Sequence, residues 1–261
     1  MRTRFLGGAL FALLVLASCE DRKEPVLQEE PIKSISFTIS AFHEDGDEVT
    51  PLSKTALAEG NAILWSDQDT VGIYPNVGAQ VYFEITGGTG SSTASFDGGG
   101  WALKGSSVYY AYYPFIGDIY LDRNKIPVSY LSQKQIGTTV YDHIGPFDFM
   151  YAAGTSAENG ALNFAFTHLN CIIRFVVSGL PAGSYQRLTL TAPTACFVKE
   201  GYYDLTSASP AIVATEYTDN MVIDLEGITL EEEGSFTVYM MCAPVNLNGV
   251  TVQVGLLDSS T

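Results

Sequence analysis

The sequence is short of basic residues: 13 Lys and Arg stand against 29 Asp and Glu, for a formal net charge of −16 over 261 residues. Charged residues make up only 16% of the chain, so the acidity reflects missing cations rather than an excess of charge. Because binding to phosphate requires clustered Lys and Arg, this composition argues against a nucleic-acid partner. The hydrophobic content of 46% is ample for a folded core and argues against a disordered chain.

Residues with catalytic or metal-binding patterns are also scarce. The three histidines, His43, His143 and His168, have no metal-ligand spacing, and no G-x-S-x-G elbow is present. The glycine-rich segment at 87–92 lacks the lysine of a phosphate loop, and Asp67-Gln68-Asp69 lacks the later Gly and Glu of a calcium loop. We therefore expect a loop tip and a structural turn there, and no catalytic residues, metal or cofactor.

The first residues have the pattern of an export signal. Arg2 and Arg4 precede an apolar run at 5–17, which has the length of a signal-peptide core and is too short to span a bilayer. The run ends in Leu16-Ala17-Ser18-Cys19, which resembles the lipobox of bacterial lipoproteins. We expect residues 1–18 to be a signal peptide and Cys19 to carry acyl chains that anchor the protein. The alternative is an ordinary secretory peptide that happens to contain a cysteine.

Cleavage before Cys19 would leave 11 basic and 29 acidic residues, a net charge of −18. Membrane attachment must then come from the acyl chains rather than from attraction to anionic lipid. Residues 19–32 are polar, contain two prolines and have no periodicity, so they are expected to form a lipidated tether.

Only three cysteines remain beyond Cys19, so at most one internal disulfide can form. Cys171, Cys196 and Cys242 all lie in apolar strand contexts, where free cysteines act as small core residues. A bridge between Cys171 and Cys242 in an oxidising compartment stays open as the alternative.

After the tether the hydrophobic period is two. Ile35, Phe37 and Ile39 alternate with polar residues, which indicates a strand with one buried face. We expect further strands at 71–74, 80–85, 108–113, 147–152, 162–166, 171–177, 186–191, 196–198, 211–214, 221–225, 236–241 and 250–256. Frequent Gly, Pro and Asn between short strands predict an all-β fold of sandwich type, and the absence of βαβ alternation argues against a parallel nucleotide-binding sheet.

The number of strands indicates two tandem β-sandwich domains, an N-terminal one at 33–158 and a C-terminal one at 159–261. Within the first, the run Tyr109-Tyr110-Ala111-Tyr112-Tyr113 could form an aromatic platform for a glycan. Alternate residues of a strand point to opposite faces, however, so we favour a strand whose two tyrosine sets fill the core on one side and cover the second face of the sheet on the other.

Three segments form a recognisable set. The most specific is Trp65-Ser66 followed by Asp69 and Val71-Gly72-Ile73-Tyr74. The others are the tyrosine run at 109–113 with Pro114, and Leu162-Asn163-Phe164 continuing to His168. In this order they resemble passages of the fimbrillin family, the lipoprotein subunits of type V pili.

The resemblance implies two transthyretin-like β-sandwich domains and a protein held at the outer membrane by lipid on Cys19 and exposed at the cell surface in a pilus. Family subunits are trimmed after their first strand, and a strand from the next subunit fills the groove that remains. Here the removable first strand corresponds to Ile35, Phe37 and Ile39. Family trimming favours arginine, whereas Lys54 is the only basic residue of the loop at 44–55, so Lys54 is the candidate cleavage site. An untrimmed member would keep its strand and its lipid, as an anchor subunit does.

Family members commonly continue beyond the strand at 250–256 and supply the donor strand from that end, so either the C-terminal domain is truncated here or its donor is absent. We expect a non-enzymatic pilus subunit or adhesin whose partners are other subunits, joined by donor-strand exchange. The alternatives are a glycan-binding surface lipoprotein of a polysaccharide uptake system, which needs exposed coplanar aromatics, and a lipid-anchored hydrolase, which needs a cleft with a paired acid and base.

Overall fold

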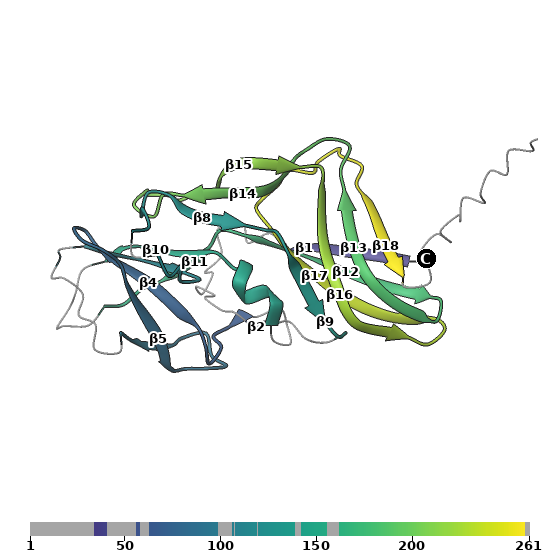
Figure 1. The fold of residues 1–261 in the computed structure, drawn as a ribbon, viewed down its shortest axis with the longest axis horizontal. Coiled ribbons are helices and arrows are strands. Elements are labelled where there is room, and N and C mark those ends of the chain that lie inside the picture. Colours follow the sequence, from purple (N-terminus) through teal and green to yellow (C-terminus); the bar gives the residue numbers. More distant parts are fainter. Residues whose placement is uncertain are drawn as a thin grey trace, which may run out of the picture. The chain divides into compact units, whose positions relative to one another are not determined.

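The computed structural model describes residues 34–40, 56–57, 63–98, 106, 108–118, 120–138, 142–155 and 162–258. Residues 32–261 cluster as one compact unit. Its regular elements are strands apart from one short 3-10 helix in the described part, so the predicted all-β fold is confirmed (Figure 1). None of the described residues forms a helix long and apolar enough to cross a membrane.

Up to residue 168, the described residues form eleven strands and the 3-10 helix η1. They are β1 (Ser34–Ser40), β2 (Ala56–Leu57), β3 (Ile63–Leu64), β4 (Thr70–Pro75), β5 (Val81–Gly87), β6 (Ser95–Asp97), β7 (Tyr109–Tyr113), β8 (Ile126–Ser129), β9 (Gln133–Ile136), η1 (Asp142–Phe147), β10 (Met150–Thr155) and β11 (Phe166–His168). The later strands are longer. They are β12 (Cys171–Leu180), β13 (Gly183–Thr191), β14 (Phe197–Tyr203), β15 (Val213–Thr218), β16 (Asn220–Leu230), β17 (Gly234–Cys242) and β18 (Gln253–Asp258).

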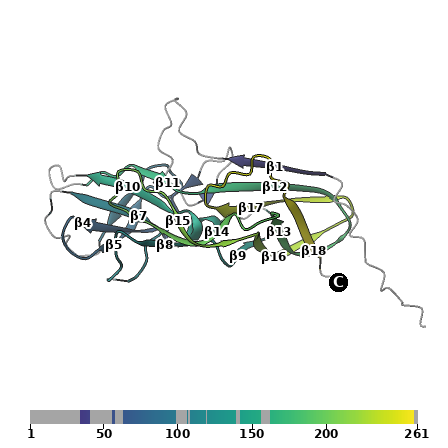
Figure 2. The ribbon, with the colours of Figure 1, turned by 90° about the horizontal axis from the view of Figure 1, so that it is seen from above.

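Two of the sheets share one apolar core. One has the order β1-β12-β17 and the other β18-β13-β16-β9 (Figure 2). Their long strands alternate apolar and polar residues, so each sheet has one apolar face, and these faces belong to the same buried cluster. Tyr185 of β13 and Phe236 of β17 join the two sheets, with ring centroids 5.8 Å apart.

A six-stranded sheet of order β11-β10-β7-β4-β5-β6 lies beside a three-stranded sheet of order β15-β14-β8. β7 is buried on both faces: Tyr112 belongs to the large core, and Tyr109 and Tyr113 belong to a second cluster around Trp65. This confirms the prediction that the tyrosine run fills the core on one side and covers the opposite sheet face on the other.

The described strands differ from the sequence predictions at several places. The strand expected at 162–166 begins only at Phe166, as β11, and the two-residue strands β2 and β3 were not expected. β8 contains Pro127 and lies where no strand was expected; proline is tolerated there because β8 is an edge strand. β6 and β9 were not expected because their segments are short and, in β9, the buried positions are glutamines. The strand expected from residue 147 begins only at Met150, because η1 occupies the preceding residues.

Strand pairing crosses the predicted domain boundary at 158/159 in several places. β10 and β11 lie on either side of it and pair with each other, β8 pairs with β14, and β9 pairs in parallel with β16. β1, predicted in the N-terminal domain, pairs with β12. The sheets therefore take strands from both segments, and the two-domain division stays a prediction.

Candidate functional site

The predicted removable strand forms one edge of the β1-β12-β17 sheet. β1 pairs with β12 in antiparallel register along its whole length, from Ser34 opposite Ser178 to Ser40 opposite Ile172. The three predicted positions fall on alternate register pairs: Ile35, Phe37 and Ile39 lie opposite Val177, Phe175 and Ile173. The chain thus places its first strand against a strand more than a hundred residues later.

The hydrogen-bonding direction of β12 follows from its other neighbour, β17. The amides of Tyr239 and Met241 in β17 donate to side chains outside the sheet, so they point away from β12. Because hydrogen-bonded pairs alternate along an antiparallel ladder, the odd-numbered residues of β12 bond to β17 and the even-numbered ones bond to β1. The backbone groups that face β1 are therefore those of Ile172, Arg174, Val176 and Ser178.

The odd-numbered side chains of β12 form part of the sandwich core. Ile173, Phe175 and Val177 are at most 2% exposed, and their register partners on β17, among them Val238 and Met240, are equally buried. Residues opposite each other on an antiparallel ladder share a face of the sheet. The apolar positions of β1 therefore have the register of the core face, whereas Ser36 and Thr38 have the register of the other face.

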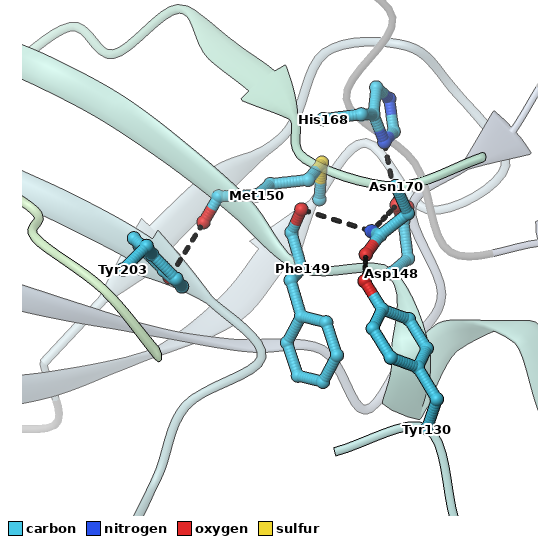
Figure 3. A network of polar contacts seen from close by, with 7 residues as sticks. All are labelled: Tyr130, Asp148, Phe149, Met150, His168, Asn170 and Tyr203. Carbon is cyan, nitrogen blue, oxygen red and sulfur yellow. Dashed lines mark hydrogen bonds and ion pairs between the residues drawn. The ribbon is translucent and has the colours of Figure 1, made fainter. Parts of the chain in front are cut away.

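A buried polar network lies where β10, β11 and β12 meet (Figure 3). His168 Nδ1 is 2.6 Å from Asp148 Oδ1, and the two side chains are only 6% and 1% exposed. The Asn170 amide donates to Asp148 Oδ1 and to the Phe149 carbonyl, and the Tyr130 hydroxyl donates to Asn170 Oδ1. These bonds tie the end of β8 to the start of β12. The second oxygen of the carboxylate, Asp148 Oδ2, is buried without a hydrogen-bond partner.

The network contains a histidine–carboxylate pair of the kind that can orient a general base. Here the pair is closed off from solvent, and burial holds the pKa of Tyr130 well above its usual range, helped by Cys242, Cys171 and Asp148. Tyr130 consequently remains a protonated hydrogen-bond donor. The arrangement has the chemistry of a structural clamp, and the sequence analysis missed it because Asp148, His168 and Tyr130 are separated in the chain.

The three described cysteines are free thiols. Cys171 and Cys242 lie directly opposite each other in the β12–β17 ladder. Burial raises the pKa of both thiols, and the neighbouring Cys171 adds to the effect at Cys242. Both therefore stay protonated at neutral pH, which suits core residues rather than nucleophiles.

The segment from Trp65 to Tyr74 packs into the fold through its buried residues, whereas Asp67 and Gln68 at its turn are exposed. The Trp65 ring meets Phe96, Tyr113 and Phe166 edge to face, with centroids 5.0–5.7 Å apart. Asp69 accepts from the Ser66 amide at 2.7 Å and from the Tyr113 hydroxyl at 3.0 Å. The expectation of a structural turn at residues 67–69 is thus confirmed.

The remaining predicted positions are distributed as follows. Cys19, Lys54 and His43 lie outside the described residues. The glycine-rich segment at 87–92 forms the tip between β5 and β6, where the Gly90 amide donates to the Trp65 carbonyl at 2.8 Å. Among the described residues, no group of three or more His, Cys, Asp or Glu is placed to hold a metal ion. Exposed tyrosines in this part of the chain, Tyr120 and Tyr217, lie on different elements, a loop and β15.

Comparison with protein families gives one match. The family model described as Fimbrillin-like matches residues 53–260, a span that contains the Trp65–Tyr74 segment and every strand after β1. No curated protein matches the chain.

Proposed function

The chain belongs to the fimbrillin-like family, and on that premise we propose that it is a structural subunit of a cell-surface pilus that assembles by strand exchange at β12. In this proposal β1 occupies the acceptor edge until a strand from another subunit replaces it. Its role in this proposal is structural rather than enzymatic, and its partners are other copies or other pilus subunits.

The observation that carries the proposal is the position of β1. β1 is the outermost strand of its sheet and has one neighbour, β12. No pair of the other described strands is joined through β1, so its departure leaves the order of the remaining strands intact. A strand in this position can be exchanged without taking the sheet apart.

Departure of β1 would leave an edge suited to another strand. The N–H and C=O groups of Ile172, Arg174, Val176 and Ser178 would lose their partners, and such an edge templates the addition of a strand. A donor that alternates apolar and polar residues would restore these hydrogen bonds. Its apolar residues would take the register positions opposite Ile173, Phe175 and Val177.

We infer that lipid on Cys19 anchors the protein at the outer membrane, with the tether at 19–32 carrying the folded unit away from it. Support comes from the lipobox pattern Leu16-Ala17-Ser18-Cys19. The substitution Cys19→Ala should move the protein from the membrane fraction to the soluble fraction after export. Membrane retention of the variant at the level of the unsubstituted protein would contradict the anchor.

Two maturation states are compatible with this anchor. If the chain is cut at Lys54, β1 and the lipid leave together and the subunit can enter a polymer. If it is not cut, β1 stays and the protein serves as an anchor subunit. In the first case Lys54→Gln should abolish the release of the folded part from cells. In the second case the substitution should leave the amount released unchanged.

Strand exchange can be tested on the full chain. A recognition sequence for a specific protease is placed between residues 44 and 53, and the protein is cut after folding. The probe is a fluorescent peptide with the sequence of Ser34–Ser40, and the control is the same peptide with Phe37→Asp. We expect the cut protein to bind the first peptide and not the second, and the uncut protein to bind neither. Equal binding by cut and uncut protein, or none by either, would refute strand exchange at β12.

A further inference from the structure

The edge opposite β1 in the same sheet is β17, and side chains cover its part from the Thr237 carbonyl to Met241. Gln133 and Gln135 of β9 reach the outer backbone of β17 from the neighbouring sheet. Gln133 accepts from the Met241 amide at 2.7 Å and donates to the Met241 carbonyl at 2.8 Å. Gln135 accepts from the Tyr239 amide at 3.1 Å and donates to the Thr237 carbonyl at 2.8 Å.

These four hydrogen bonds replace the ones that a neighbouring strand would make with the backbone of β17. A glutamine side chain carries one carbonyl and one NH₂ group, the same donor and acceptor types as a peptide unit. The remaining outward group of Tyr239, its carbonyl oxygen, lies 2.8 Å from His143 Nε2 and is hydrogen-bonded to it. The outward groups of Tyr239 and Met241 are therefore all bonded without any neighbouring strand.

The alternation of β9 explains how one short strand serves two sheets. Gln133 and Gln135 are 1% and 0% exposed, whereas Lys134 and Ile136 between and after them are exposed. The backbone of β9 pairs in parallel with β16, and Lys134 forms a salt bridge with Glu226 of β16. β9 is thus held by β16 through its backbone and offers its buried amides to β17.

We propose that Gln133 and Gln135 close the β17 edge and so restrict strand uptake to the β12 edge, giving the subunit one acceptor edge instead of two. The inference rests on the proposed function, because it assigns the direction of the same exchange. A sheet with two open edges could add strands on both sides and lead to branched or irregular association. A sheet sealed on one side can extend only in one direction.

Glutamine is required for this role because an apolar residue of the same size would exclude water without bonding the edge. Leucine at either position would leave a buried N–H and a buried C=O of β17 without partners, and each such group is costly. Closure of the β17 edge therefore differs from ordinary core packing, because it depends on the hydrogen bonds of the two side-chain amides and not on the volume of the side chains.

The first test compares Gln133→Leu/Gln135→Leu with Gln80→Leu in the otherwise unchanged full chain. Gln80 is a matched control, since it is also buried and hydrogen-bonded but belongs to another part of the fold, beside Tyr112. We expect hydrogen exchange at the Tyr239 and Met241 amides to rise roughly ten-fold or more in the double variant. The Val238 and Met240 amides, which face β12, should change less.

The single variants keep the test decisive if the double variant does not fold. Gln133→Leu should accelerate exchange at Met241 more than at Tyr239, and Gln135→Leu should do the reverse. Exchange that is unchanged, or that rises equally at all four amides and in Gln80→Leu, would overturn the inference.

The second test asks whether an opened β17 edge accepts a strand. A photoreactive peptide with the sequence of Ser34–Ser40 is added to the uncut protein, and cross-links are mapped by mass spectrometry. For this test both side chains are removed, and we expect cross-links within Gly234–Cys242 in Gln133→Gly/Gln135→Gly and none there in the original protein or in Gln80→Gly. Absence of these cross-links in the variants overturns the inference, whatever the cut protein does at β12. Failure of the cut protein to bind peptide at β12 refutes the proposed function instead.

Discussion

Replacing Thr38 by proline should loosen β1 from β12 through a single backbone hydrogen bond. Thr38 lies opposite Arg174, and the direction of the ladder makes this a hydrogen-bonded pair in which the Thr38 amide donates to the Arg174 carbonyl. Proline has no N–H and cannot make this bond. Thr38→Ala, which keeps the amide, is the matched control.

The size of the effect follows from the unpaired carbonyl. A backbone group that loses its partner costs about 1–3 kcal/mol, which corresponds to a rise of roughly 5-fold to 150-fold in the population with β1 detached. The remaining strands keep their neighbours, because β1 is at the edge of its sheet. The global free energy of unfolding should therefore change less than the local opening does.

The assay is residue-resolved hydrogen exchange in the full chain. The amides of Ile172 and Val176 should exchange faster in Thr38→Pro than in Thr38→Ala, whereas that of Leu188, in the core of β13, should exchange alike in both. Equal rates at Ile172 in the two variants would refute the assigned ladder. Equal acceleration at Leu188 would refute the view that β1 opens independently.

Three further predictions concern the folded body. Asn170→Leu should lower the free energy of unfolding by about 1–3 kcal/mol, measured by chemical denaturation, because Tyr130 and the Phe149 carbonyl lose a buried partner; an unchanged value would contradict the clamp. Gly72→Ala should cost about 1–3 kcal/mol, since a Cβ there would lie 2.1 Å from Tyr112 Cε1, whereas Gly183→Ala, which meets no atom within 4 Å, should not. Burial raises the pKa of Tyr112 from 10.0 to about 12, so the stability that its protonated form contributes is complete below pH 10 and is lost as the pH rises toward 12. The free energy of unfolding should therefore fall over that range by about 2–3 kcal/mol more in the original protein than in Tyr112→Phe; an equal fall in both would contradict this role of Tyr112.

The location of the first strand could be predicted from the sequence, but its partner could not. The alternation of Ile35, Phe37 and Ile39 predicts a strand, and the structure has one at Ser34–Ser40. Alternation indicates which residues share a face, but the register against Ile173 and its neighbours depends on how the whole sandwich closes. No local pattern carries that information across so long a separation in the chain.

The contacts of the buried polar groups could not be predicted from the sequence, for a related reason. Gln133-Lys134-Gln135 has the alternation of a strand, but with polar residues at the buried positions, and a hydrophobic pattern cannot detect it. The partners of these glutamines lie on β17, a hundred residues later. His168 was visible in the sequence, but its contact with Asp148 required the pairing of β10 with β11.

The family motif, in contrast, can be explained residue by residue. Trp65 fills the second core, Asp69 fixes the turn through Ser66, and Gly72 leaves the space that the Tyr112 ring occupies. The Tyr74 hydroxyl donates to the Leu121 carbonyl at 2.7 Å. A pattern of this kind indicates the fold strongly because each residue has a separate packing role, and it says nothing about assembly.

The most direct test of strand exchange is hydrogen exchange at the four β12 amides that face β1, those of Ile172, Arg174, Val176 and Ser178, in three states of the protein. We predict slow exchange in the intact chain, fast exchange after the chain is cut between residues 44 and 53 and β1 is removed, and slow exchange again once a peptide with the sequence of Ser34–Ser40 is added. Amides that stay slow after β1 has gone, or that stay fast with the peptide present, would contradict exchange at this edge.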